Sequence, residues 1–198
     1  MERNMVPVII EDGKHGTTAI DIYSWLLKQN IIYVDNVITH ETANIFNTQL
    51  MSKQKNGVSH VDIYINSPGG SVYGLMSMLD MINMTSIQVR THCCGMAMSA
   101  AAILLLAGER GHRTMTENSE VMFHDLSTYM NGTIKDIDVE YFQVQKQKKR
   151  LIKFVSEALI GYTEKRVEDE LFNRNCYLDA EKAVEIGVVD KIKEKIIE

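Results

Sequence analysis

Residues 87–108 read IQVRTHCCGMAMSAAAILLLAG, and the change of pattern inside this segment indicates the fold class. Its first part, IQVRTHCC (Ile87–Cys94), predicts a β-strand, and the residues after Met98 (AAAILLLAG) predict a helix. The segment is therefore a strand that runs directly into a helix. Repetition of that unit along a chain is typical of an α/β protein.

The same alternation extends from this segment in both directions. The expected elements are a helix with Ile20, Ile22, Trp25, Leu26 and Leu27 after the caps Thr17 and Thr18, a strand at 31–34, a helix with Ala43, Ile45, Phe46 and Leu50, a strand at 61–66, a helix with Val72, Leu75, Met76, Leu79 and Ile82, and a strand at 120–124. This order predicts a largely parallel sheet with right-handed crossovers.

The composition is that of one globular domain, or of one domain with an appendage, in 198 residues. Hydrophobic residues make up 45% of the chain and charged residues 24%, which excludes intrinsic disorder. A net charge of −5 and the absence of a basic stripe argue against nucleic-acid binding.

No segment indicates export or a membrane span. The start lacks the apolar run of a signal peptide, and the longest apolar stretch, Met96–Ala107, is shorter than the roughly 18–20 residues of a span. Three cysteines, of which Cys93 and Cys94 are adjacent, form neither a disulfide framework nor a zinc pattern. We therefore expect a soluble cytoplasmic protein without a metal or cofactor.

A long helix is expected from Thr133 to about Ile160. Apolar residues recur there at helical spacing without a helix breaker, and about 27 residues correspond to roughly 40 Å. Its polar middle, residues 145–150, indicates a solvated face rather than a nucleic-acid site. A monomer cannot bury the flanking apolar seam, so we expect a homo-oligomer.

Two junctions between a strand and a helix could carry chemistry. In the first, Gly69-Gly70 lets the backbone approach a ligand; in the second, Ser99 lies in the first helical turn, where the helix dipole favours an anion. The N–H groups of Gly70 and of Ser99 or Ala100 could then form an oxyanion hole. Taken alone, an N-cap serine and an ordinary tight turn are the more frequent interpretations.

A serine nucleophile needs a base, and six histidines are available. His15, His60 and His112 lie in polar loops, His40 is at a helix start, and His92 within a strand could be a core histidine. His124 ends the predicted strand 120–124, at the carboxyl edge where α/β proteins bind ligands. A structural role for His124 is about equally compatible with its position.

Four motifs in order resemble the proteolytic subunit of the Clp protease, the ClpP family. They are INSPGGSV (65–72), GMAMSAAAILLLAG (95–108), VMFH (121–124) and YLDAEKAVEIGVVDKI (177–192), and AIDIYSWLLKQNIIYV (19–34) resembles that family's first helix and strand. The resemblance implies a crotonase-like spiral of ββα units, with residues 1–18 as an axial segment, 19–198 as one peptidase domain and about 133–160 as a protruding handle helix.

The resemblance also implies a serine endopeptidase that cleaves unfolded polypeptide. Ser99 corresponds to the nucleophile, His124 to the general base, and the backbone N–H groups of Gly70 and Ala100 to the oxyanion hole. The family forms heptameric rings that stack as a tetradecamer through the handle helix, and an AAA+ unfoldase feeds it. Arg174 corresponds to an arginine at the contact between the rings.

Several positions depart from the family's pattern. The usual third triad aspartate is Asn175, and the aspartate that pairs with the ring-contact arginine is Asn173. An amide can orient the His124 ring but lacks the charge that stabilises an imidazolium, so we expect weak or conditional activity, with Asp125 or Asp179 as possible substitutes. Asp125–Tyr129 replaces the usual Gln-Pro-Leu-Gly-Gly, and Asp62 replaces an aromatic of the unfoldase docking pocket.

Three alternatives to an active ring peptidase stay open. A slow or silent ring subunit could assemble with an active paralogue, which Asn173 and Asn175 favour. The same spiral fold also serves acyl-CoA chemistry, which would give Ser99 no role. A stand-alone protease that matures a viral shell is the third alternative, and Asp62 favours independence from an unfoldase.

Overall fold

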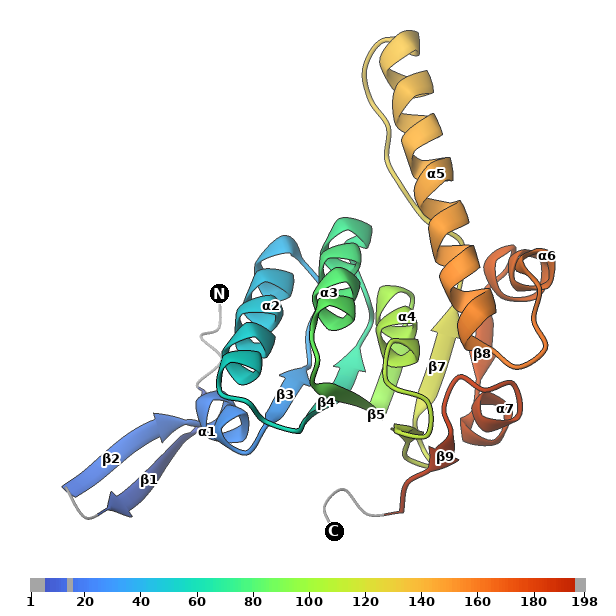
Figure 1. Cartoon of the computed structure of the whole chain (residues 1–198). Helices are drawn as coiled ribbons and strands as arrows, with labels where there is room; N and C mark the ends of the chain where they lie inside the picture. Colours follow the sequence, from blue (N-terminus) through green and yellow to red (C-terminus); the bar gives the residue numbers. More distant parts are fainter. Residues whose placement is uncertain (1–5, 14–15, 195–198) are drawn as a thin grey trace.

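The structure, a computed structural model, describes residues 6–13 and 16–194. Figure 1 shows helices that stand on one face of a curved sheet, a hairpin that extends from one end, and a long helix that projects beyond the body at the other end. The sheet order and the long helix together confirm the predicted α/β class.

The elements alternate between strands and helices over most of the chain. In order they are β1 (Val8–Gly13), β2 (Gly16–Asp21), α1 (Ile22–Lys28), β3 (Ile31–Val34), α2 (His40–Lys55), β4 (His60–Ser67), α3 (Val72–Met84), β5 (Gln88–Met98), α4 (Ala100–Leu106), β6 (Arg113–Met115), β7 (Glu120–Phe123), α5 (Ile134–Ala158), α6 (Glu164–Val167), the π-helical turn η1 (Glu168–Phe172), β8 (Cys176–Leu178), α7 (Ala180–Glu185) and β9 (Lys191–Ile192).

The sheet is parallel except at one edge. Strands β3, β4, β5, β6 and β9 are neighbours in that order, while β7 pairs in parallel with β5 and antiparallel with β8. Strand β5 thus has two partners on the same side: Thr91–Cys93 pair with β6, and Met96–Met98 pair with β7.

Gly95 is the residue at which β5 changes partner. Its φ of +103° is a conformation that side chains rarely adopt, and a Cβ there would lie 2.6 Å from the Asn66 Oδ1 atom. Two hydrogen bonds hold the bend: the Gly95 N–H donates to the Ser119 Oγ at 2.8 Å, and the Met96 N–H to the Asn66 Oδ1 at 3.2 Å. The strand is thereby directed from β6 to β7.

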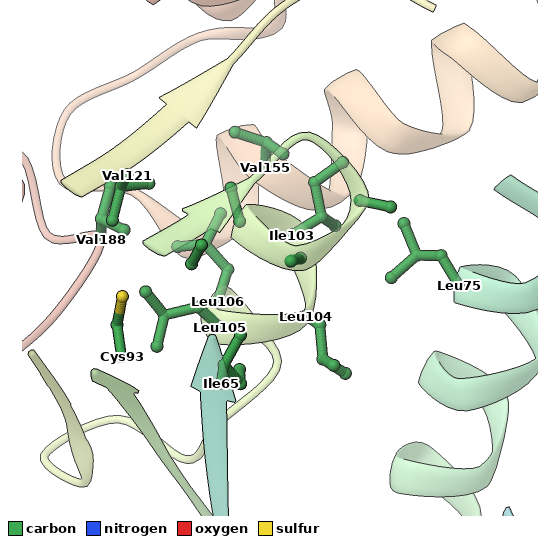
Figure 2. Close-up of a cluster of buried hydrophobic side chains, with 14 of the residues drawn as sticks. Ile65, Leu75, Cys93, Ile103, Leu104, Leu105, Leu106, Val121, Val155 and Val188 are labelled. Carbon is green, nitrogen blue, oxygen red and sulfur yellow. The ribbon is translucent and has the colours of Figure 1, made fainter. Parts of the chain in front are cut away.

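Helix α4 occupies the centre of the hydrophobic core. All its residues are buried, as expected for a helix that is apolar all round. Figure 2 shows side chains from the strands, from α3 and from α5 around it, including Ile65, Leu75, Val121 and Val155. In the part of the chain that is described, no helix has the length and apolar composition of a membrane span.

Most of the predicted elements are confirmed, with differences at their ends. The helix expected after Thr17 and Thr18 begins only at Ile22, because those threonines and Ile20 pair in β2 and Asp21 provides the N-cap. Strand β5 continues to Met98, past the predicted end at Cys94. The long helix is confirmed as α5, with Thr133 as its N-cap and its last residue two before Ile160. Strands β1, β2, β6, β8 and β9, the short helices α6 and α7 and the turn η1 were not predicted.

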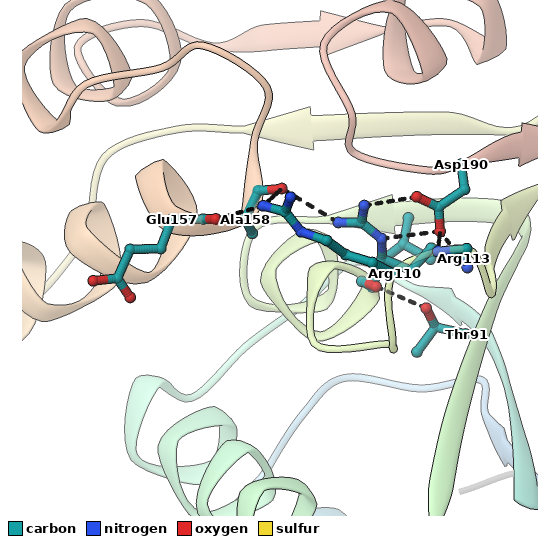
Figure 3. Close-up of polar contacts among 8 residues, drawn as sticks. Thr91, Arg110, Arg113, Glu157, Ala158 and Asp190 are labelled. Atoms are coloured by element: carbon teal, nitrogen blue, oxygen red, sulfur yellow. Dashed lines mark hydrogen bonds and ion pairs between the residues drawn. The ribbon is translucent and has the colours of Figure 1, made fainter.

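A buried arginine connects the end of α5 to the carboxyl-terminal part of the sheet. The Arg113 guanidinium, almost fully buried, donates to the Asp190 carboxylate (Nη2 to Oδ1 at 2.8 Å), and the Arg113 backbone N–H donates to Oδ2 at 2.8 Å. Arg110 donates to the carbonyl oxygen of Glu157 at 2.7 Å (Figure 3). These bonds hold the base of α5 against β6 and the segment before β9.

We predict that Asp190→Ala lowers the free energy of unfolding at pH 7 by about 3 kcal/mol, because it leaves the buried Arg113 charge unpaired. Burial would raise the pKa of Asp190, but the hydrogen bonds from Arg113 outweigh it and hold the pKa below its usual value. The pair therefore stabilises the fold above the unfolded-state pKa of about 4 and loses this effect as the pH falls below it.

Urea denaturation at pH 7 and at pH 3 measures this effect. The difference between wild type and Asp190→Ala should shrink at pH 3. Glu185→Ala is the control, because it removes an exposed ion pair with Lys182 and should change stability by less than roughly 1 kcal/mol. Equal effects of the two substitutions at pH 7 would contradict the prediction.

Candidate active site

A small cavity of about 60 Å³ lies where the start of α4, the loop before α3 and the end of β7 meet. Ser99, His124, Gly70 and Ala100 all contribute to its wall, together with Val72, Leu75, Ile103, Phe123, Asp125, Leu126, Ser127, Leu151 and Phe172. The structure therefore brings four of the predicted site residues to one cavity. Its wall is apolar on the α3 and α5 sides.

Ser99 occupies the turn between β5 and α4 in a strained backbone conformation. Its φ and ψ are 56° and −121°, a region that residues other than glycine rarely adopt and that costs of order 1–3 kcal/mol. The Ser99 N–H donates to the Met122 carbonyl at 2.7 Å. Ser99 does hold the N-cap position of α4, but its side chain forms no capping hydrogen bond. Its hydroxyl is therefore not used to cap the helix.

The Gly69-Gly70 loop packs directly against this turn. A Cβ on Gly69 would lie 2.8 Å from the Ala100 nitrogen and 2.9 Å from the Ser99 Cβ, so only glycine allows the approach. In the parallel bridge between Gly70 and Ile38, Ile38 bonds to the Gly69 carbonyl and to the Ser71 N–H. The Gly70 N–H faces away from that bridge, and the Ala100 N–H lies in the first turn of α4, where no intrahelical acceptor exists.

His124 directly follows β7, where its position is set by strand pairing. Met98 pairs with Met122, so Ser99 and His124 are the first residues beyond the neighbouring ends of β5 and β7. The His124 side chain is half-buried. Among the described residues no hydrogen bond joins the His124 ring to the Ser99 hydroxyl. Hydrogen bonds between catalytic groups are often long or poorly aligned in enzymes without substrate.

Asn175 lies opposite His124 in the backbone register but outside the cavity wall. The antiparallel pairing of β7 with β8 sets Phe123 against Cys176, and one further step sets His124 against Asn175. The Asn175 side chain is exposed, and the described region contains no hydrogen bond between it and the His124 ring. The structure thus brings the two backbones together without joining the side chains.

The two aspartates considered as substitutes for Asn175 have other partners. The Asp125 carboxylate accepts a hydrogen bond from the Lys148 ammonium group at 2.8 Å and from the Leu126 N–H at 2.8 Å. Asp179 caps α7 by accepting from the Lys182 N–H at 2.9 Å. Both carboxylates are hydrogen-bonded to groups other than His124. Neither therefore replaces Asn175 as the partner of the His124 ring in this structure.

Sequence reasoning did not identify Lys148 as part of this region. The residue lies on α5, 23 positions after Asp125, within the stretch interpreted as a solvated face. Its side chain is nearly buried, which corrects that interpretation at this position. Asp125 itself is exposed, and no local pattern in the sequence pairs it with a lysine 23 positions later.

Asp62 lies on the floor of a separate, wide groove of about 910 Å³ lined by α1, β4, β5, β6 and β9. The buried His92 ring bonds to the Asp62 carboxylate (2.8 Å) and to the Thr114 hydroxyl (2.7 Å), so His92 is a satisfied core histidine. Burial would raise the pKa of Asp62, but the hydrogen bond and charge of His92 outweigh it and lower the pKa. Asp62, His92 and Thr114 thus form a chain of hydrogen bonds along the groove floor.

Arg174, the predicted ring-contact residue, is exposed between η1 and β8. Its Nε donates to the Glu170 carbonyl at 3.4 Å, and Asn173 beside it is also exposed. The segment from His124 to Thr133 forms no strand or helix. No cluster of three or more metal-binding side chains occurs within residues 6–13 and 16–194.

Comparison with known proteins identifies relatives over almost the whole chain. A family model described as Clp protease matches residues 14–196. The chain is 34% identical over 193 residues to the ATP-dependent Clp protease proteolytic subunit 2 of Chlamydia abortus (strain DSM 27085 / S26/3), covering 97% of this chain and 93% of that protein. It is 35% identical over 189 residues to the protein of the same name from Chlamydia pneumoniae, covering 95% and 92%.

A third relative carries a related name. The chain is 34% identical over 194 residues to the ATP-dependent Clp protease proteolytic subunit 1 of Salinibacter ruber (strain DSM 13855 / M31), covering 96% of this chain and 82% of that protein. The fold, the motifs around Ser99 and His124, and these matches agree. The chain belongs to the ClpP family of Clp protease proteolytic subunits.

Proposed function

We propose that this chain is a serine endopeptidase subunit that hydrolyses peptide bonds of unfolded polypeptides inside a ring-shaped chamber. The observation that carries the proposal is the shared cavity, whose wall contains a hydroxyl, an imidazole and two backbone N–H donors. Ser99 is the nucleophile, His124 the general base, and the N–H groups of Gly70 and Ala100 form the oxyanion hole. Family membership supports the same assignment.

The proposed reaction is acyl transfer in two halves. The Ser99 oxygen attacks the peptide carbonyl while His124 takes the hydroxyl proton, and the resulting oxyanion accepts hydrogen bonds from Gly70 and Ala100. The imidazolium then donates its proton to the leaving amine, which frees the new amino terminus. Water, deprotonated by His124, finally releases the acyl group and regenerates the serine.

Asn175 takes the third position and limits the rate. Its amide oxygen can accept the ring N–H of His124 but supplies no negative charge for the imidazolium. A second candidate function, a slow or silent ring subunit beside an active paralogue, is favoured by this substitution and by the Asn175 side chain, which is exposed and not bonded to His124.

The subunit works as part of an assembly. The outer half of α5 exposes Ile134, Tyr141 and Phe142, a set of apolar side chains that a second copy would cover, which supports heptameric rings stacked as a tetradecamer. In that assembly Arg174 lies at the contact between rings, residues 6–13 and 16–18 are axial and 19–194 form the peptidase domain; the rest of the expected ranges 1–18 and 19–198 lies outside the described residues. An AAA+ unfoldase delivers substrate in the cytoplasm, and the polar Asp62 floor weakens its docking to this subunit.

We predict that a fluorophosphonate probe labels the purified protein covalently at Ser99, because the strained turn holds a hydroxyl beside a base and two N–H donors. Ser99→Ala and His124→Ala should each lose labelling. Ser127→Ala, which removes another hydroxyl from the same cavity wall, should keep it. Intact-protein and native mass spectrometry measure labelling and ring size together. A ring that stays unlabelled would favour the silent subunit, and an unlabelled monomer would count against both candidates.

We predict that Asn175→Asp raises the rate of labelling roughly a hundredfold, because a carboxylate opposite His124 stabilises the imidazolium by about 2–3 kcal/mol. Asn131→Asp is the matched control, since it makes the same change in charge at an exposed residue of the loop after β7 and should leave the rate unchanged. Rates are measured at fixed probe concentration on rings of equal size. An Asn175→Asp rate no higher than the control rate would remove Asn175 from the third position.

A further inference from the structure

Lys148 is a nearly buried cation in the middle of α5 with two acidic partners. Its ammonium group donates to the Asp125 carboxylate at 2.8 Å and lies 3.5 Å from a carboxylate oxygen of Glu168. Burial alone would lower the pKa of Lys148, but the hydrogen bond and charge of Asp125, with those of Glu168, outweigh it and raise the pKa. The lysine is therefore charged at every pH at which a peptidase works.

The three residues connect the three segments that surround the candidate site. Asp125 follows His124 directly, Lys148 is one turn before the cavity-lining Leu151 of α5, and Glu168 begins the η1 turn that leads through Phe172 to Asn175. Residues 124–133 have no regular secondary structure, so strand hydrogen bonds do not fix the chain beyond β7. The hydrogen bond from Lys148 to Asp125 connects the start of that chain to α5, and the next residue, Leu126, packs against the hydrophobic core.

We propose that Lys148 is a positioning residue of the hydrolytic site: by holding the Asp125 carboxylate on α5, it fixes the backbone at His124 and keeps the imidazole facing Ser99. The inference rests on the proposed function and adds to it a residue that touches neither substrate nor nucleophile. Lys148 also neutralises Asp125. Of the residues in the cavity wall, His124 and Asp125 are the two with an ionisable side chain.

Removal of the lysine should therefore have two separable effects. The loop carrying His124 loses its anchor, which lowers the rate of Ser99 acylation at every pH. The Asp125 charge is no longer neutralised, and a negative charge on the residue next to the base favours the protonated form of that base. Because the base must be neutral to take the Ser99 proton, the acid limb of the pH–rate profile should shift to higher pH.

The experiment compares Lys148→Met, Lys148→Arg, Asp125→Asn and the double variant Lys148→Met/Asp125→Asn in the full chain. Lys153→Met is the matched control, since it makes the same substitution on α5 at an exposed ion pair with Glu157. The first measurement is the rate of fluorophosphonate labelling between pH 5 and 9. The second is the pKa of His124 from NMR of ¹³C-labelled histidine, assigned with His124→Gln, which requires no activity.

We expect Lys148→Met to label about tenfold more slowly at pH 7 with its acid limb displaced upward, while Lys148→Arg stays within about twofold of wild type. The double variant should stay slow but lose the displacement, and Asp125→Asn should be slow without an upward displacement. A Lys148→Met protein that matches Lys153→Met in both rate and pH profile would overturn the inference.

Two further outcomes separate this inference from the proposed function. If the wild type is not labelled, the hydrolytic function fails, and the NMR titration decides the inference: an unchanged His124 pKa in Lys148→Met rejects it. If Lys148→Met does not fold, as circular dichroism would report, Asp125→Asn decides, and a wild-type labelling rate in that variant rejects the positioning role.

Discussion

The bend of β5 at Gly95 is the constraint on which the candidate site depends. Before the bend Thr91–Cys93 pair with β6, whereas after it the last three residues of β5 pair with β7. That pairing brings the end of β5 next to the end of β7, and so sets Ser99 beside His124. A glycine conformation and two hydrogen bonds to Asn66 and Ser119 thus determine a site that lies several residues further along the chain.

Rigid packing around Ser99 maintains a backbone conformation that is unfavourable by itself. The fully buried α4 cannot move, the Ser99 N–H is held by Met122, and Gly69 closes the turn from the other side. A serine kept at positive φ by such surroundings is pre-organised, so substrate binding need not supply the ordering energy. The backbone at Ser99 is therefore fixed, whereas the described residues contain no hydrogen bond from the His124 ring to the Ser99 hydroxyl or to Asn175.

The sequence predicted the elements with strong periodicity and the residues of short, specific motifs. The buried α4 and the long α5 follow from local patterns, whereas the pairing of Ser99 with His124 was expected from the resemblance to the ClpP family, and both residues line one cavity. Strands β6, β8 and β9 are two or three residues long, too short for an alternating pattern, and they exist because longer strands offer them hydrogen bonds. The Asp125–Lys148 contact was equally invisible, because it joins residues 23 positions apart whose pairing only the fold establishes.

The carboxylates of this chain stand at other positions than the pattern of the ClpP family would give. Residues 173 and 175 carry no carboxylate. The carboxylates of Asp62 and Asp125 each contact a buried basic side chain, which is His92 for Asp62 and Lys148 for Asp125. Asp125 directly follows His124, and its carboxylate accepts hydrogen bonds from Lys148 and from the Leu126 N–H. Under the proposed function the base is therefore held through a lysine of α5, the same helix whose outer half exposes apolar side chains. A contact that shifts α5 would alter the position and the charge environment of His124 together, which links assembly to catalysis through one ammonium group.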